Sequence, residues 1–174
     1  MDAKVPEASV DEKLRENFIE GMRNVAHSVT VVTTDGPAGR FGATVSAFSS
    51  VSADPPMVMV CLMDGSRISN AVAANKRFAV NVLAPDQRLV AERFAGAHDK
   101  QLTDRFDDID FTDWGDGLPI LDKTTAFHCN VDRVIKAATH NIILGAVVST
   151  HAHDGEPMIY MDRKFRSLAK VETN

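Results

Sequence analysis

The chain has 174 residues, of which 44% are hydrophobic, 25% charged and 6% aromatic, and this composition predicts one globular domain with a sizeable core. The formal net charge is −5 with no basic cluster, which excludes an ordinary nucleic-acid binder. No apolar run approaches the ~18 residues of a membrane span, so we expect no membrane partner.

The chain termini and the cysteines indicate the compartment. The N-terminus is polar and charged, unlike a secretory signal. Cys61 and Cys129 lie far apart in apolar runs, and no metal-type cysteine pair is present. We therefore expect a cytoplasmic protein in which both cysteines are buried free thiols.

The N-terminal region is predicted to be an arm followed by a helix. Residues 1–8 are expected to form a flexible arm and residues 9–174 a single domain. Ser9-Val10-Asp11-Glu12 fits a capping box, which predicts a helix that ends near Ala26. The apolar stripe of that helix consists of Leu14, Phe18, Met22 and Val25.

A β-hairpin is predicted next. Val29–Thr34 is β-branched throughout, as in a buried strand, and the turn residues 35–39 join it to a second strand over Arg40–Pro56. That second strand is rich in small and hydroxyl residues, whereas core strands favour large apolar ones. Small side chains let a flat ligand or a phosphate reach the backbone. A Ser/Thr-rich outer strand facing water would have the same composition.

The remainder of the chain predicts more strands than helices. The predicted elements are a strand at Met57–Met63, a helix at Arg67–Ala74 capped by Ser66, a strand at Arg77–Leu83, a helix at Pro85–Phe94, a long loop at 95–118, a strand region at Leu121–Lys136 with a break near Asp122-Lys123, a strand at Asn141–Thr150, and a closing pair at Met158–Met161 and Phe165–Val171. Long ordered loops are often functional. The sum is a mainly β fold, an antiparallel barrel with helices at its ends.

Common catalytic motifs are absent from the sequence. It contains no Gly-x-Gly-x-x-Gly, no P-loop and no nucleophile elbow. The tract His151–Asp154 lies among turn residues, so a solvated turn is favoured over a metal site, and we expect no metal. His140 precedes a long strand, where a capping or surface role is more common than a catalytic one.

Four segments together carry a resemblance to a known family: Thr30–Thr34, Gly42–Pro56, Phe78–Leu83 and Phe94-Ala95. They resemble the short-chain flavin reductases, the NAD(P)H-dependent partners of two-component monooxygenases, over about residues 18–168. The resemblance implies an FMN-binding split β-barrel and a homodimer with the flavin near the interface. It implies FMN or FAD as the flavin and NADH or NADPH as the electron donor.

The resemblance also implies a set of site residues. The isoalloxazine ring should lie along Thr44, Val45, Ser46, Ala47, Phe48 and Ser49. Cys61, Leu62 and Met63 should pass beside the flavin chain, with Ser66 and Arg67 at the phosphate, in agreement with anion binding at helix N-termini. Phe165 stands in the closing hairpin where the family often has Tyr.

One motif departs from the family. Ala138-Thr139-His140 replaces the usual Gly-Asp-His, so His140 is expected near the nicotinamide, with its geometry and the donor preference open. Three functions remain open. The protein reduces free flavin for a monooxygenase, or retains its flavin and reduces a bound acceptor such as a cobalt corrin, or binds flavin or haem without turnover.

Overall fold

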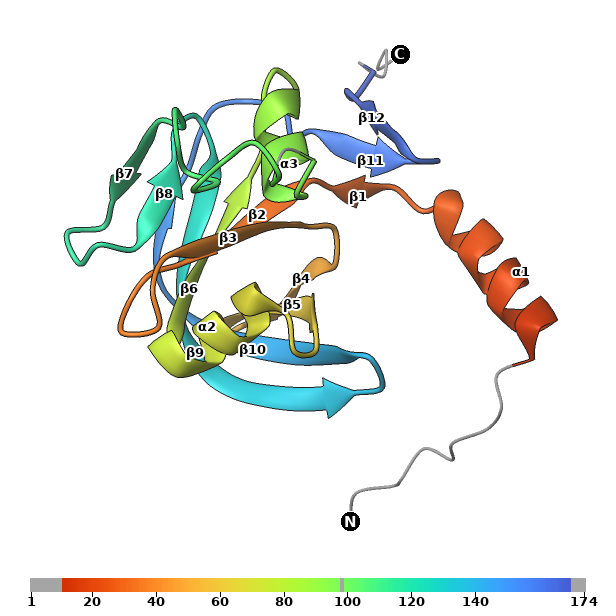
Figure 1. Ribbon diagram of the computed structural model, residues 1–174, viewed down its shortest axis with the longest axis horizontal. Coiled ribbons are helices and arrows are strands. Elements are labelled where there is room, and N and C mark those ends of the chain that lie inside the picture. Colours follow the sequence, from red (N-terminus) through yellow and green to blue (C-terminus); the bar gives the residue numbers. More distant parts are fainter. Residues whose placement is uncertain (1–10, 98, 170–174) are drawn as a thin grey trace.

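A computed structural model describes residues 11–97 and 99–169 and contains a curled antiparallel sheet with three short helices around it (Figure 1). The helices are α1 (Glu12–Arg23), α2 (Arg67–Asn75) and α3 (Arg88–Phe94). The strands are β1 (His27–Ser28), β2 (Thr30–Thr34), β3 (Phe41–Val45), β4 (Phe48–Ala53), β5 (Pro56–Met63), β6 (Arg77–Val82), β7 (Phe111–Asp113), β8 (Pro119–Leu121), β9 (Thr125–Ala137), β10 (His140–His151), β11 (Ile159–Met161) and β12 (Lys164–Arg166).

Seven strands form the main sheet in the order β3-β2-β6-β9-β10-β5-β4. The strands at its two ends, β3 and β4, are consecutive in the chain, so the sheet curls until its edges meet. Only Ser46 and Ala47 separate them, and the Cys61 N–H donates to the Ala47 carbonyl at 3.0 Å. The expected split β-barrel is therefore confirmed.

Two smaller sheets lie against this barrel. The sheet β1-β11-β12 contains the closing pair, and β7 pairs with β8. The predicted hairpin before and after residues 35–39 is present, because Thr30 to Thr34 pair with Val45 to Phe41.

Strand β2 is buried on both faces, which explains its unbroken β-branched sequence. Val32 belongs to the core inside the barrel, together with Phe78 and Ile143. Val31 belongs to a second core between the barrel and α3, together with Phe94. This second core supports the wall of the cavity described below.

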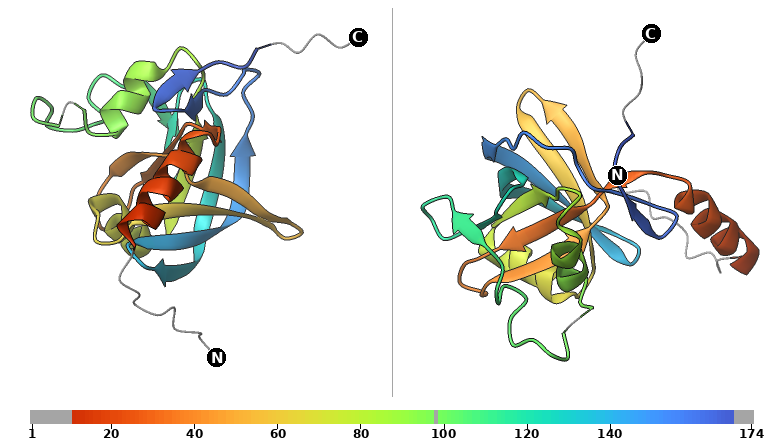
Figure 2. Two further views of the ribbon diagram at one scale, coloured as in Figure 1. Left: turned by 90° about the vertical axis from the view of Figure 1, so that its right-hand side faces the viewer. Right: turned by 90° about the horizontal axis from the view of Figure 1, so that it is seen from above.

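Helix α1 extends away from the barrel and has no buried residue (Figures 1 and 2). It begins at Glu12, with the Asp11 side chain accepting from the Lys13 N–H, so Asp11 is the observed cap. The predicted end near Ala26 is wrong, since the helix stops at Arg23. Ser9 and the arm at 1–8 lie outside the described residues.

Two other predicted boundaries are wrong for local reasons, and a third region agrees with the prediction. The strand predicted over Arg40–Pro56 is two strands, because the chain bends at Ser46-Ala47 to close the barrel. Helix α3 begins at Arg88, because the Gln87 side chain accepts from the Ala84 N–H and holds a turn first. The strand region over Leu121–Lys136 is broken near Asp122-Lys123 as predicted, because Leu121 pairs in β8 and β9 begins at Thr125.

The two cysteines differ in burial. Cys129 is fully buried, and burial raises the pKa of its thiol to about 12. Cys61 is only half-buried, so the prediction of a buried free thiol holds for Cys129 and is wrong for Cys61. No helix in the described ranges is both long and apolar enough to cross a membrane.

Candidate flavin site

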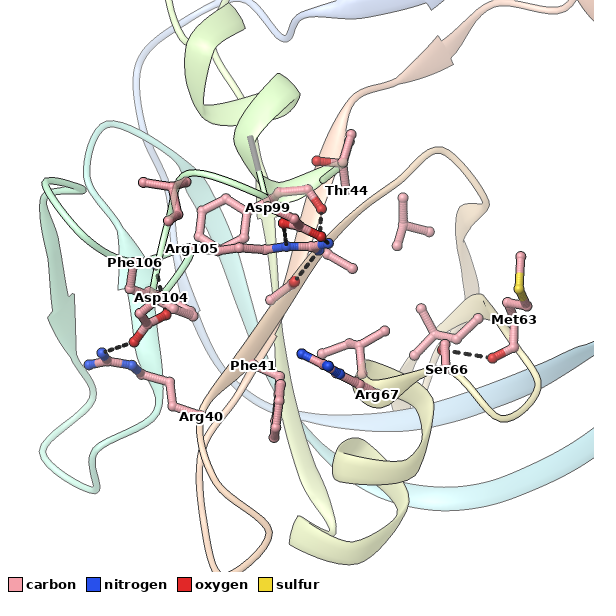
Figure 3. A pocket seen from close by; sticks show the side chains of 18 of the residues that line it. Arg40, Phe41, Thr44, Met63, Ser66, Arg67, Asp99, Asp104, Arg105 and Phe106 are labelled. Atoms are coloured by element: carbon pink, nitrogen blue, oxygen red, sulfur yellow. Dashed lines mark hydrogen bonds and ion pairs between the residues drawn. The ribbon is translucent and has the colours of Figure 1, made fainter. Parts of the chain in front are cut away.

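A cavity of about 1120 Å³ lies between β3, the start of α2, the end of α3 and the segment 99–106 (Figure 3). Ten of the thirteen predicted site residues line it: Thr44, Val45, Ser46, Ala47, Cys61, Leu62, Met63, Ser66, Arg67 and His140. The structure thus brings together residues from four separate parts of the chain.

The other three predicted residues lie outside this cavity. Phe48 packs against Phe127, with ring centroids 5.7 Å apart, and lines a smaller cavity of about 240 Å³. Ser49 is exposed on β4. Phe165 packs against Tyr160 in the closing hairpin. Their contact with flavin stays a prediction.

The bend between β3 and β4 presents unpaired backbone to the cavity. The N–H groups of Ser46 and Ala47 donate to no residue that the structure describes. The Thr44 hydroxyl, in contrast, is already used, because it donates to the Ala91 carbonyl at 2.6 Å and ties β3 to α3. The available donors are therefore backbone groups, as a flat heteroaromatic ligand requires.

The start of α2 provides an anion-binding end. The Ser66 hydroxyl accepts from the Ser69 N–H at 3.3 Å and donates to the Met63 carbonyl, so it caps the helix as predicted. The N–H groups of Arg67 and Ile68 have no acceptor within the described ranges. The Arg67 side chain projects into the cavity (Figure 3) and, among the described residues, has no ion-pair partner. Free N–H groups and a cation at a helix N-terminus favour a phosphate.

His140 lies at the cavity edge on the turn between β9 and β10. Its Nδ1 is 3.0 Å from the Thr139 hydroxyl. Ala138 has a φ of +51°, a left-handed conformation that favours glycine, which explains why the family usually has Gly there. The turn is held in place because the Asp64 N–H donates to the Thr139 carbonyl and Lys136 pairs with Asp64 at 2.8 Å.

The segment 99–106 forms a cavity wall that sequence reasoning did not resolve. We predicted a functional loop over 95–118 but assigned no residue in it. Arg105 pairs with Asp99 through both carboxylate oxygens, at 2.8 and 2.6 Å. Arg40 pairs with Asp104 at 2.7 Å and lies over the Phe106 ring. The only signal in the sequence was alternating acidic and basic residues in a loop.

These ion pairs keep both carboxylates charged. The hydrogen bond from Arg105 is the main cause that lowers the pKa of Asp99, and the charge of Arg67 also contributes. Burial works to raise the pKa of Asp104, but the Phe106 N–H and Arg40 outweigh it, so that pKa is also lowered.

The site offers binding rather than protein-based catalysis. Among the described residues no three His, Cys, Asp or Glu side chains gather as a metal site, and His151 is the last residue of β10. The cavity combines unpaired backbone N–H donors, a helix N-terminus that can bind phosphate, and an exposed edge at His140. This donor set fits a flavin mononucleotide, whose own ring carries the redox chemistry.

Comparison with known proteins identifies similar proteins that are named as flavin reductases or flavin oxidoreductases. An FMN reductase (NADH), RutF, of Ancylobacter novellus is 34% identical over 169 residues, covering 96% of this chain and 90% of the relative. RutF of Stutzerimonas stutzeri is 32% identical over 158 residues, 90% of each chain. The NADH:FAD oxidoreductase SgcE6 of Streptomyces globisporus C-1027, solved with NAD and FAD fragments, has a TM-score of 0.84 at 28% identity and covers 95% of this chain and 99% of its own.

The family model agrees with these relatives. The flavin reductase like domain matches residues 22–169, which include every strand of the barrel and every cavity residue named above. This chain therefore belongs to the flavin reductase family, as its sequence predicted.

Proposed function

We propose that the protein transfers hydride from NADH to FMN and supplies the reduced flavin to a partner monooxygenase in the cytoplasm. The observation that carries this proposal is the pairing, in one cavity, of unpaired backbone at Ser46-Ala47 with the free helix end at Ser66-Arg67. The relatives named FMN reductase (NADH) support the choice of FMN and NADH.

The cavity residues would hold the flavin from end to end. The Ser46 and Ala47 N–H groups would donate to the heteroatom edge of the ring. Cys61 and Met63 border the middle of the cavity, and the N–H groups of Arg67 and Ile68 receive the phosphate. When bound, the flavin ring accepts the hydride, so the protein needs no nucleophile or paired carboxylates.

The cavity is also large enough for the nicotinamide donor. Its ~1120 Å³ exceeds the roughly 300–1,000 Å³ of a pocket for one drug-sized ligand. Ala43, Ser46 and Ala47 are small, so a second flat ring can stack on the flavin. His140 at the cavity edge would hydrogen-bond the carboxamide of that ring.

A homodimer is part of the proposal. Cys61 and Met59 on β5 lie opposite Ile142 and Leu144 on β10, and cross-strand partners share a face. This face is only half-buried in the single chain. Since Cys61 also borders the cavity, a second copy docked here would complete the site.

Flavin-dependent NADH oxidation by the purified protein tests the proposal. We expect oxidation only when FMN, FAD or riboflavin is added, fastest with FMN and NADH. Absence of oxidation above background with every flavin and with both NADH and NADPH would overturn it. A protein that purifies yellow and keeps its flavin through turnover would instead indicate a reductase of a bound acceptor.

A further inference from the structure

Arg105 joins three segments of the cavity wall. Its Nε and Nη2 donate to the two oxygens of Asp99, while its Nη1 donates to the Phe94 carbonyl at 2.8 Å and the Gly42 carbonyl at 3.2 Å. A bidentate pair of this kind is strong and fixed in geometry. The single guanidinium therefore fixes where the Asp99 carboxylate lies.

The Asp99–Arg105 pair faces the phosphate end of the cavity. In Figure 3, Arg67 points from α2 across the cavity towards this pair. Arg67, Asp99 and Arg105 all line this one cavity, and the charge of Arg67 contributes to the lowered pKa of Asp99. A phosphate bound at Arg67 would therefore lie within range of both charges of the pair.

The charges that line the cavity nearly cancel. Asp104 is paired with Arg40 and Asp99 with Arg105, which leaves Arg67 as the cation without an ion-pair partner among the described residues. Removal of either member of the Asp99–Arg105 pair would change the net charge beside the phosphate by one unit. A charge in a partly screened site acts on a phosphate more than on a neutral group.

We propose that the Asp99–Arg105 ion pair sets how strongly the protein prefers FMN over riboflavin, an inference that rests on the proposed function. Asp99 accepts from both Nε and Nη2 of Arg105 and neutralises its charge. Without Asp99, Arg105 becomes a second cation for the phosphate. Without Arg105, Asp99 becomes an unpaired anion that repels the phosphate.

The ratio of the dissociation constants for riboflavin and FMN tests this inference, because riboflavin lacks only the phosphate. We expect Asp99→Asn to raise the ratio by about fivefold and Arg105→Gln to lower it by about as much, as for a partly exposed charge interaction. The double variant should return the ratio towards that of the wild type. Added salt should reduce both changes.

A matched control is the Arg77–Asp116 pair, which has similar exposure but lies outside the cavity. Asp116→Asn should leave the ratio unchanged. If the single variants at 99 and 105 weaken the binding of FMN and of riboflavin equally, the ion pair only stabilises the cavity wall and the inference is wrong. If the wild-type protein binds neither FMN nor riboflavin, both the proposed function and this inference are wrong. If the wild-type protein oxidises NADH with FMN but the ratio of dissociation constants is the same in the variants as in the wild type, only this inference is wrong.

Discussion

At Gly42 on β3, the rings of Phe94 and Phe106 pack closely against the backbone of the sheet. A Cβ atom at this position would lie 2.5 Å from Phe94 Cε1 and 3.3 Å from Phe106 Cζ. Phe94 is fully buried and cannot move aside without shifting α3. Glycine is thus required here by space and not by backbone conformation.

We predict that Gly42→Ala destabilises the protein by about 1–3 kcal/mol, as overpacking usually does, and weakens FMN binding. Chemical denaturation and flavin titration measure the two effects. Gly21→Ala is the matched control, because nothing lies within 4 Å of its Cβ on the exposed α1. That control should gain about 0.5–1 kcal/mol from helix propensity. If Gly42→Ala leaves the stability unchanged, Phe94 and Phe106 can move to accommodate the added methyl group and the prediction is wrong.

His140 is exposed at the cavity edge, and its one hydrogen-bonding neighbour among the described residues is Thr139. We predict that His140→Ala slows reduction of bound FMN by NADH by about tenfold, the loss of one hydrogen bond of ~1–2 kcal/mol. The dissociation constant of FMN should change little. Anaerobic stopped-flow reduction and flavin titration separate the two.

His151→Ala, at the opposite end of β10 and outside the cavity, is the control for that experiment. A variant at position 140 that binds FMN more weakly but reduces it at the normal rate would contradict a nicotinamide role. If neither FMN binding nor its reduction changes, the departure at Ala138-Thr139 marks a nicotinamide site that lies elsewhere.

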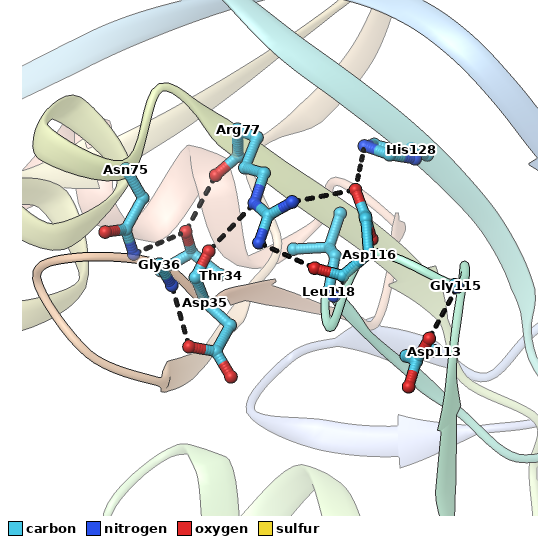
Figure 4. A network of polar contacts seen from close by, with 10 residues as sticks. All are labelled: Thr34, Asp35, Gly36, Asn75, Arg77, Asp113, Gly115, Asp116, Leu118 and His128. Carbon is cyan, nitrogen blue, oxygen red and sulfur yellow. Dashed lines mark hydrogen bonds and ion pairs between the residues drawn. The ribbon is translucent and has the colours of Figure 1, made fainter.

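At the scale of elements, the β7–β8 hairpin covers His128 on β9 (Figure 4). Its Nε2 lies 3.7 Å from Asp116, and its ring lies 5.5 Å from the Trp114 ring. Burial is the main cause that lowers the pKa of His128 below 6.5. The charge of Arg77 lowers this pKa further, whereas the charge of Asp116 works to raise it. Protonation of His128 is therefore less favourable in the folded chain than in the unfolded one.

We predict that stability falls as the pH drops below about 6.5, because the unfolded chain then binds a proton that the folded chain does not. The loss should level off below the folded pKa. Melting temperatures between pH 8 and pH 5 measure it, and fluorescence of Trp114, the single tryptophan, reports the hairpin itself. His128→Gln should flatten the profile in this window. An equally steep profile for that variant would assign the effect to other groups.

The elements that could be predicted are those with local signals. Ser66 caps α2 through its own hydroxyl, and β2 is β-branched because both its faces are buried, so each left a clear pattern in the sequence. The bend at Ser46-Ala47 has no such local pattern in the sequence. It forms because the chain must turn from β3 to β4 where the sheet closes. The Asp99–Arg105 pair also depends on tertiary contacts with Phe94 and Gly42. The cavity walls contributed by strands were therefore predictable, and the wall contributed by the loop was not.

At the scale of the whole molecule, two of the places where the described residues expose apolar surface are α1 and one face of the barrel. Helix α1 exposes its predicted stripe, with Phe18 64% accessible, so the stripe does not pack on its own barrel. On the barrel, Ile135 is 40% accessible opposite Ile142, and Met63 is 62% accessible at the cavity edge. Apolar area of this kind on both an extended helix and a sheet face is typical of an interface between subunits.

We predict a dimer in solution, with a mass about twice the 18.9 kDa of the chain at micromolar concentration. Ile135→Asp should shift it to monomer, because a charge buried at an interface is costly without a partner. The same variant should weaken FMN binding, since Cys61 belongs to both the sheet face and the cavity. Leu89→Asp, which changes an exposed apolar residue on α3 away from this face, should leave both unchanged. Analytical sedimentation with and without FMN measures the mass of the protein in solution. A wild-type monomer with flavin bound would show that one chain forms the complete site by itself.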